Sequence, residues 1–184
     1  MSSVLLEGKK VRDILPVDWD DRQHRQLMFN LALSNQRHLL NDYDHDLIMM
    51  LYQLEQHCRA GNIHGFLTLV DGQPAGAFWV EIGRYETGRI RGALFPEYRN
   101  TWNALYFLKW VVRYSFEDLE LRKLDVEMTA YKKQDKEAAA AERIYKRIGF
   151  KFRAMLPQSV VVQGVPTATI LLDYLRDDYH GFNI

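Results

Sequence analysis

The spacing of hydrophobic residues changes several times along the chain, and each change predicts a new element. Alternation over residues 10–15 predicts a short first strand. Helical spacing then runs to about residue 40, after a cap at Asp18 or Asp20. A second helix is expected over residues 47–60 and ends where a glycine follows.

A period of two residues replaces the helical period in the next part of the chain. Residues 65–70 and 74–82 are predicted strands, and Asp71-Gly72 between them is a strong hairpin signal. A turn at 84–88 leads to a third strand over 89–95. Because short turns join antiparallel strands, these three strands should form a meander.

Helices and strands alternate in the remaining part. The pattern predicts helices at 100–119 and 136–148 and strands at 123–130, 151–156 and 168–175. The two helices are long enough to be crossover connections, so parallel pairing is expected in the middle of an otherwise antiparallel sheet.

Composition narrows the class of protein. The chain has 184 residues and a formal net charge of zero, which fits one globular domain over 1–184 and gives no overall attraction to nucleic acid or anionic membrane. No apolar run approaches the roughly 20 residues that span a bilayer, and the N-terminus lacks a signal-peptide pattern. Cys58 is the single cysteine, so no internal disulfide can form and a cytoplasmic setting is expected.

Three stretches, taken in order, resemble the GNAT superfamily of N-acetyltransferases. Phe95-Pro96-Glu97-Tyr98-Arg99 is similar to its strand-to-helix junction, and the stretch Tyr114–Leu124 is similar to the branch that acetylates ribosomal-protein N-termini and polyamines. Ala141–Lys151 resembles the family's helix that ends in Tyr-x-x-x-Gly-Phe. The resemblance covers about residues 10–175 and implies an α/β fold with a twisted, mostly antiparallel mixed sheet flanked by helices.

The resemblance also implies a place for acetyl-CoA as co-substrate. The pantetheine would lie near the end of the third meander strand, and the pyrophosphate would sit on backbone amides at the start of the next helix, where unpaired N–H groups favour an anion. The first group is Ala93, Leu94 and Phe95, and the second is Arg99, Asn100, Thr101, Trp102, Asn103 and Ala104.

This loop departs from the family's pattern. Trp102 replaces the central glycine, Asn100 stands where many relatives have another, and Ala138 replaces an asparagine that holds the cofactor. The indole of Trp102 could fill the phosphate's space, or point away and leave the amides open, or pack the helix start against the sheet.

Candidate catalytic residues follow from the same resemblance. Tyr145 matches the general acid that returns a proton to the departing thiolate, with the alternative of an aromatic core residue whose hydroxyl reaches the surface. Amine acetylation also needs a base, for which Glu81, Glu97 and Glu127 are candidates, each with the alternative of a solvated surface role.

Acidic residues alternate between the first two predicted helices. Asp42, Asp44 and Asp46 could attract a cationic amine, or simply form a polar loop that caps a helix. The six histidines show no metal-binding spacing, so no metal is expected.

Two functions therefore stay open. The first is an acetyl-CoA-dependent N-acetyltransferase that acts on a primary amine: a protein N-terminus, a lysine or a polyamine. The second is a catalytically inactive GNAT-fold protein used for binding or assembly, such as a phage virion-associated protein. A homodimer is compatible with either function.

Overall fold

The computed structural model describes residues 11–35, 47–99, 101–130, 136–162 and 164–182. Within them one sheet has the strand order β1-β2-β3-β4-β5-β7-β6. β4 and β5 are the only neighbours among these described strands that run parallel. The predicted order of elements and the predicted parallel pairing are both confirmed.

The first strand and two helices form the start of the fold. These are β1 (Arg12–Pro16), α1 (Arg22–Ser34) and α3 (Leu47–Arg59). The predicted cap of α1 at Asp18 or Asp20 was wrong, because Asp21 accepts the capping hydrogen bond from the Gln23 amide. The predicted helix to residue 40 was also wrong, since α1 ends at Ser34.

The meander is β2 (Ile63–Val70), β3 (Gln73–Ile82) and β4 (Thr87–Leu94). Asp71 and Gly72 in the first turn have φ values of 52° and 74°. Positive φ at both central residues is the geometry of a tight type I′ hairpin, so the Asp-Gly signal predicted this turn correctly.

The second half begins with the short helix η1 (Pro96–Tyr98) and continues with α4 (Thr101–Glu117), β5 (Lys123–Ala130) and α5 (Lys136–Ile148). β6 (Lys151–Val162) and β7 (Val165–Leu175) are longer than predicted. Register shifts at Phe152/Ala154 and Leu156/Val160 let this hairpin continue past residues that would otherwise stop it. A last short helix is η2 (Arg176–Asp178).

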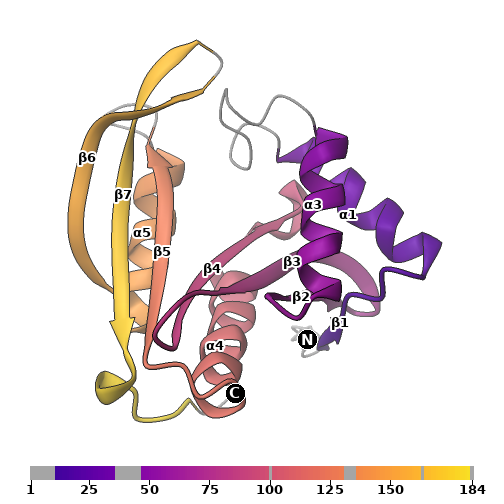
Figure 1. Ribbon diagram of the computed structural model, residues 1–184, viewed down its shortest axis with the longest axis horizontal. Helices are drawn as coiled ribbons and strands as arrows, with labels where there is room; N and C mark the ends of the chain where they lie inside the picture. The colour runs from indigo at the N-terminus through magenta and orange to yellow at the C-terminus, as the bar shows by residue number, and fades with distance from the viewer. Residues whose placement is uncertain (1–10, 36–46, 100, 131–135, 163, 183–184) are drawn as a thin grey trace, which may run out of the picture.

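Helices cover the two halves of the sheet differently. In Figure 1, α1 and α3 lie in front of the meander, and α4 and α5 lie behind the sheet. Fully buried Phe107 and Val111 of α4 join a core that includes Val80 and Leu124 of the sheet. A second core packs helix residues Met28, Leu31 and Leu54 against Leu67, Ala77 and Trp79.

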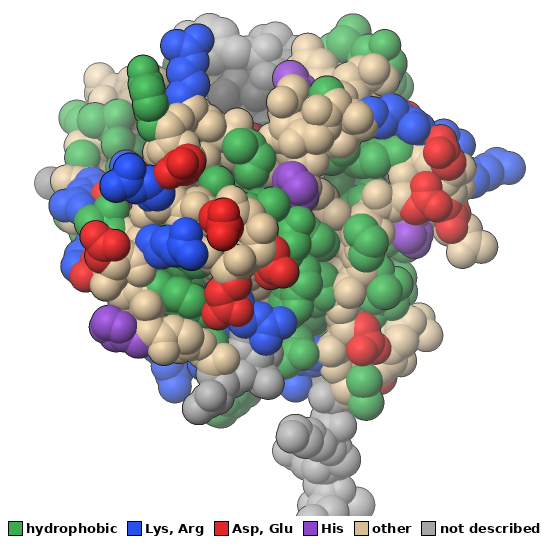
Figure 2. All heavy atoms as spheres, turned by 60° about the horizontal axis from the view of Figure 1, so that its bottom comes forward, with side chains coloured by type: hydrophobic (Ala, Val, Ile, Leu, Met, Phe, Trp, Pro, Cys, Tyr) green, Lys and Arg blue, Asp and Glu red, His purple; other side chains and the backbone are tan. Residues whose placement is uncertain are grey.

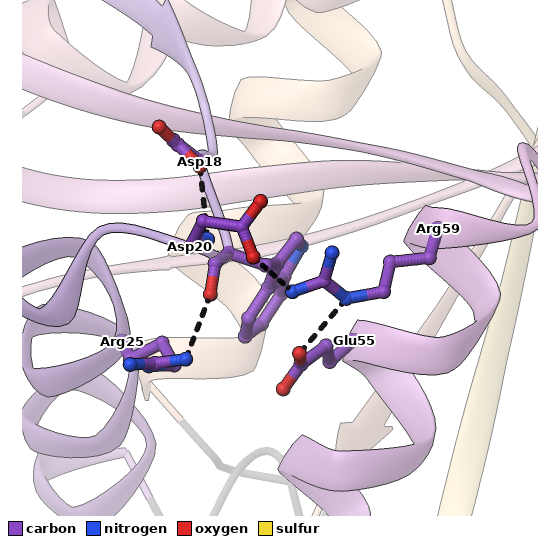
Figure 3. Close-up of polar contacts among 6 residues, drawn as sticks. Asp18, Asp20, Arg25, Glu55 and Arg59 are labelled. Atoms are coloured by element: carbon purple, nitrogen blue, oxygen red, sulfur yellow. Dashed lines mark hydrogen bonds and ion pairs between the residues drawn. The ribbon is translucent and has the colours of Figure 1, made fainter.

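Arg59 holds α3 against the connection between β1 and α1 (Figure 3). Its guanidinium reaches Asp20 at 2.7 Å and Glu55 at 2.9 Å. Arg25 of α1 donates to the backbone oxygen of Trp19 in the same connection. The hydrogen bond from Arg59 lowers the pKa of Asp20. These contacts are exposed, so they fix geometry more than they stabilise the fold.

The surface is mixed in sign. Figure 2 shows acidic and basic side chains interspersed over one face, without a patch of a single sign. This agrees with the formal net charge of zero. In the part of the chain that is described, no helix is long and apolar enough to cross a membrane.

Candidate cofactor and acceptor site

The parallel pairing of β4 and β5 is short. Thr87, Gly88 and Arg89 pair with Lys123, Leu124 and Asp125, and no described residue of β4 beyond Arg89 pairs with β5. Figure 1 shows the two strands meeting at one end and separating toward the other. Backbone groups of residues 90–94 that point away from β3 therefore lack a partner strand and can meet a ligand.

Gly88 permits the close approach at this junction. A Cβ on Gly88 would lie 2.5 Å from Leu121 Cδ1 and 3.1 Å from Leu124 Cδ2. Any side chain would therefore have to displace the residues that lead into β5. The junction is fixed by packing where the strands pair, and the strands part immediately after it.

Three residues were predicted to line the pantetheine site: Ala93 and Leu94 end β4 beside this separation, and Phe95 follows them. Leu94 is buried in the core against α4. Ala93 and Phe95 pack against the core under α1 and α3. Their side chains alternate between the two faces as strand geometry requires, so the backbone is the part that faces β5.

Arg99 connects the predicted pyrophosphate loop to α1. Its Nε donates to the Leu94 carbonyl at 3.2 Å, and its Nη2 donates to Asn35 Oδ1 at 2.7 Å. Asn35 is 3% exposed, and its own amide donates to the Leu31 carbonyl. The guanidinium therefore positions the loop by reaching back to the end of α1.

Asn103 fixes the other end of the loop. It is 1% exposed within the first turn of α4. Its side chain accepts from Arg12 Nε at 3.0 Å and donates to the Tyr98 carbonyl at 3.2 Å. The Asn103 side chain is thus engaged with the protein and ties the start of α4 to Arg12 and Tyr98.

Trp102 points away from the protein. Its exposed fraction is 71%, so the interpretation in which the indole packs the helix start against the sheet was wrong. The first turn of α4 leaves N–H groups without helical partners, among them those of Thr101 and Trp102. The glycine replacement therefore leaves these amides uncovered by the indole, while Asn100 lies outside the described residues.

Tyr145 lies on α5, on the side of the sheet that α4 and α5 cover. Its ring meets Phe150 edge-on with centroids 5.3 Å apart. Burial raises the pKa of Tyr145 to about 12. The phenol is therefore fully protonated near neutral pH, which is the state a general acid requires.

The candidate bases lie on the opposite face of the sheet. Glu127 of β5 pairs with Arg89 at 2.9 Å, and Glu81 of β3 pairs with Arg91 at 3.0 Å. Each of these side chains is roughly a third exposed. Glu127 is the nearer of the two to the separation, because Arg89 is the last residue of β4 that pairs with β5.

Other predicted residues do not join the site. Asp42, Asp44 and Asp46 lie outside the described residues. Glu97 is exposed in η1, and Ala138 is buried at 8% in the main core, where it supplies no polar group. Within the described ranges, no group of three or more metal-ligating side chains comes together.

The positions of Asn35 and Arg12 could not be found from sequence. They contact the loop from 64 and 91 residues away. Two pockets, of about 500 and 330 Å³, also lie elsewhere and include none of the predicted site residues. The smaller one is near the far end of α4, where Tyr114 hydrogen-bonds His64 at 2.9 Å.

The architecture matches solved acetyltransferases. A spermidine N-acetyltransferase from Vibrio cholerae in complex with CoA and spermine superposes with a TM-score of 0.74 at 15% identity, over 92% of this chain and 97% of that chain. This protein has the GNAT fold. A dodecameric structure of the same enzyme in an intermediate state superposes with a TM-score of 0.72 at 16% identity, over 93% of this chain and 96% of that chain.

The likeness to the GNAT fold is therefore one of structure and not of sequence. No protein-family profile matches the chain, and no curated protein matches it. The predicted fold class is confirmed, including the mixed sheet with helices on both sides.

Proposed function

We propose that this protein is an acetyl-CoA-dependent N-acetyltransferase that acts on a primary amine. The observation that carries the proposal is the separation of β4 from β5 beside an α4 N-terminus that Trp102 does not cover. The fold match adds that a structure of this architecture contains CoA together with a polyamine. A polyamine, a lysine and a protein N-terminus all present the required amine.

Donor binding would use backbone groups. Backbone amides at the start of α4, those of Thr101 and Trp102, would hold the pyrophosphate, aided by the positive end of the α4 dipole. Backbone groups at the end of β4 would pair with the pantetheine amides, as a strand would. Hydrogen bonds from Arg99 and Asn103 keep this loop in shape before the donor arrives.

Acetyl-CoA supplies an activated thioester, which a neutral amine attacks directly, so a C–N bond forms as the C–S bond breaks. A β4 amide would donate to the carbonyl oxygen as it gains charge. Tyr145 would protonate the departing sulfur. Burial raises the pKa of Tyr145 and disfavours a charged thiolate in the same site, so protonation of the sulfur as it departs avoids a buried anion.

Glu127 is the proposed base, with Glu81 as the alternative. The amine loses a proton as the C–N bond forms, and a carboxylate on this face of the sheet can take it directly or through water. Glu127 would leave its ion pair with Arg89 to do so. Asp42, Asp44 and Asp46 are proposed to attract the cationic amine.

The inactive alternative draws on two observations. Both candidate bases are engaged by arginines, and Ala138 offers no polar contact for a donor. A GNAT-fold binding or assembly protein would show the same features. The cytoplasmic setting, the single-domain organisation and a homodimer stay predictions under either function.

Titration calorimetry with acetyl-CoA separates the two functions. Thr101→Glu places a carboxylate where the pyrophosphate should bind. A negative charge at a helix N-terminus interacts favourably with the helix dipole, so this substitution should preserve the fold. We expect a micromolar dissociation constant in the wild type. Binding to Thr101→Glu should be weaker by a factor of at least roughly ten, and binding to the matched control Thr101→Gln should be unchanged. If no heat of binding is detected at acetyl-CoA concentrations near millimolar, the acetyltransferase proposal is rejected and the inactive binding or assembly protein is favoured.

An acceptor screen follows if the donor binds. Release of the CoA thiol is measured with spermidine, a lysine peptide and a peptide with a free N-terminus. Faster release with one class identifies the acceptor. Donor binding without release above the rate in water would again favour the inactive alternative.

A further inference from the structure

Trp102 differs from the other three tryptophans in its exposure. Trp19 and Trp79 are 7% and 6% exposed. Trp110 stacks in parallel on Tyr114 with centroids 5.4 Å apart. Trp102 is 71% exposed, so a large flat aromatic surface faces solvent beside the proposed pyrophosphate site.

The backbone that carries this indole is held rigidly. Successive residues of an α-helix are rotated by about 100°, and the next residue, Asn103, is buried and tied to Arg12 and Tyr98. Val111, nine positions after Trp102 and therefore about 180° around the helix from it, is 0% exposed in the core. Because these residues fix the rotation of α4, Trp102 must project outward from its first turn.

We propose that Trp102 is the stacking surface for the adenine of the acyl-CoA donor. This inference rests on the proposed function, because a pyrophosphate bound at the start of α4 brings the attached adenosine close to this helical turn. An uncharged indole leaves the positive potential of the amides there unchanged. Aromatic stacking on a base tolerates any orientation in the ring plane, so one exposed indole is sufficient.

The proposal defines which donor the protein selects. Free acyl-CoA carries an adenosine, whereas an acyl group on the phosphopantetheine arm of a carrier protein does not. A residue that contributes to donor binding only through its contact with adenine therefore increases the affinity for free acyl-CoA and not for an acylated carrier protein. A glycine in the loop would let the backbone approach the pyrophosphate closely. Stacking of adenine on Trp102 would then replace the affinity that such a contact would have given.

Ligand truncation tests this directly. Calorimetry measures the binding of CoA and of 4′-phosphopantetheine, which lacks adenosine, to the wild type, Trp102→Ala and Trp102→Phe. We expect Trp102→Ala to weaken CoA by about 5- to 150-fold and to leave phosphopantetheine unchanged. Trp102→Phe should recover part of the loss. Tyr85→Ala removes another exposed aromatic residue, 88% exposed, and should change neither affinity.

The other outcomes overturn the inference in distinguishable ways. If Trp102→Ala binds CoA as the wild type does, stacking is rejected while the proposed function stands. If both ligands weaken equally, the indole shapes the loop and does not read adenine. If the substitution instead dissociates an oligomer in sedimentation, the indole belongs to an interface between copies. If the wild type binds no CoA, the proposed function fails together with the inference.

Discussion

The two halves of the sheet are covered differently on either side of the β4–β5 junction. β1 to β4 lie between α1 and α3 on one face and α4 on the other, and both faces contribute to a core (Figure 1). β5, β7 and β6 have α5 on one face and charged side chains on the other. Lys123 lies 2.7 Å from Asp125 and 3.7 Å from Asp173, which Arg153 also contacts at 2.6 Å.

This difference explains where a reaction can take place. The half that is covered on both faces carries the loop around Arg99, which hydrogen bonds connect to Leu94 and to Asn35 at the end of α1. The half that is covered on one face leaves Glu127 exposed to solvent, where the proposed amine could reach it. The proposed chemistry lies at the boundary, with Tyr145 behind the sheet and Glu127 in front of it.

The largest effect should come from removing a core aromatic residue. Phe107→Ala, at a fully buried position of α4, should lower the free energy of unfolding by about 3–5 kcal/mol because it leaves a cavity. Phe152→Ala, on β6 and 48% exposed, should lower it by less than about 1 kcal/mol. Denaturant unfolding measures both, and equal losses would show that the two halves do not differ as described.

Tyr145→Phe tests the boundary itself. We expect kcat to fall by about 10²- to 10⁴-fold while CoA affinity is unchanged, because the hydroxyl acts on the departing sulfur. With a pKa of about 12, Tyr145 stays protonated through the neutral range, so its ionisation should not reduce the rate below about pH 11. A variant with wild-type kcat would make Tyr145 a core residue only.

The raised pKa of Tyr145 also has a consequence for stability. The folded state holds this proton more tightly than the unfolded chain, so its share of stability is present below the unfolded pKa of about 10 and declines as pH rises toward 12. Removing the hydroxyl removes this dependence. The free energy of unfolding, measured from pH 9 to 11, should therefore decline less in Tyr145→Phe than in the wild type.

Removing the hydrogen bond between Arg99, in the predicted pyrophosphate loop, and Asn35 at the end of α1 should have an intermediate effect. Asn35→Ala removes the acceptor for Arg99, and we expect CoA affinity to fall by roughly tenfold, since the loop loses its support. Arg99→Ala should give a similar loss. The double variant should lose little more than either single variant, because residues in contact do not act additively. Fully additive losses would show that the hydrogen bond does not couple the two elements.

The smallest effect is expected at the exposed ion pairs under α3. Arg59→Gln should reduce stability slightly at neutral pH and low salt, and the difference should vanish at high salt. Because Arg59 lowers the pKa of Asp20 below 3.8, the contribution is present above that pH and is lost as the pH falls through the lowered value. A difference that survives in high salt would indicate a packing role for Arg59.

Local patterns were enough to predict most elements of this fold. The predicted bounds of β5 and α5 match the structure, because clear periodicity is flanked by a glycine at position 149. The cap of α1 could not be chosen among Asp18, Asp20 and Asp21, since each has the same capping chemistry. The length of β6 was missed because Pro157 and Gln158, whose φ is 52°, resemble a terminator but lie in a bulged region.

The candidate site was less accessible to sequence than the fold. The resemblance placed Arg99 in the donor loop, but its partner Asn35 is 64 residues away, and no local pattern encodes such a contact. The direction of the Trp102 side chain depends on the burial of Asn103 beside it, which in turn depends on Arg12 from β1. Such orientations follow from tertiary packing and become visible only in the folded chain.

The short junction between β4 and β5 also bears on how the protein is made. β1 to β4 come from residues 12–94, and β5 to β7 come from residues 123–175, so the chain passes from one set of strands to the other once, through α4. During synthesis the first four strands emerge before any residue of β5, and N-terminal units begin to fold first. The first four strands can therefore pair with one another before α4 brings β5 beside β4.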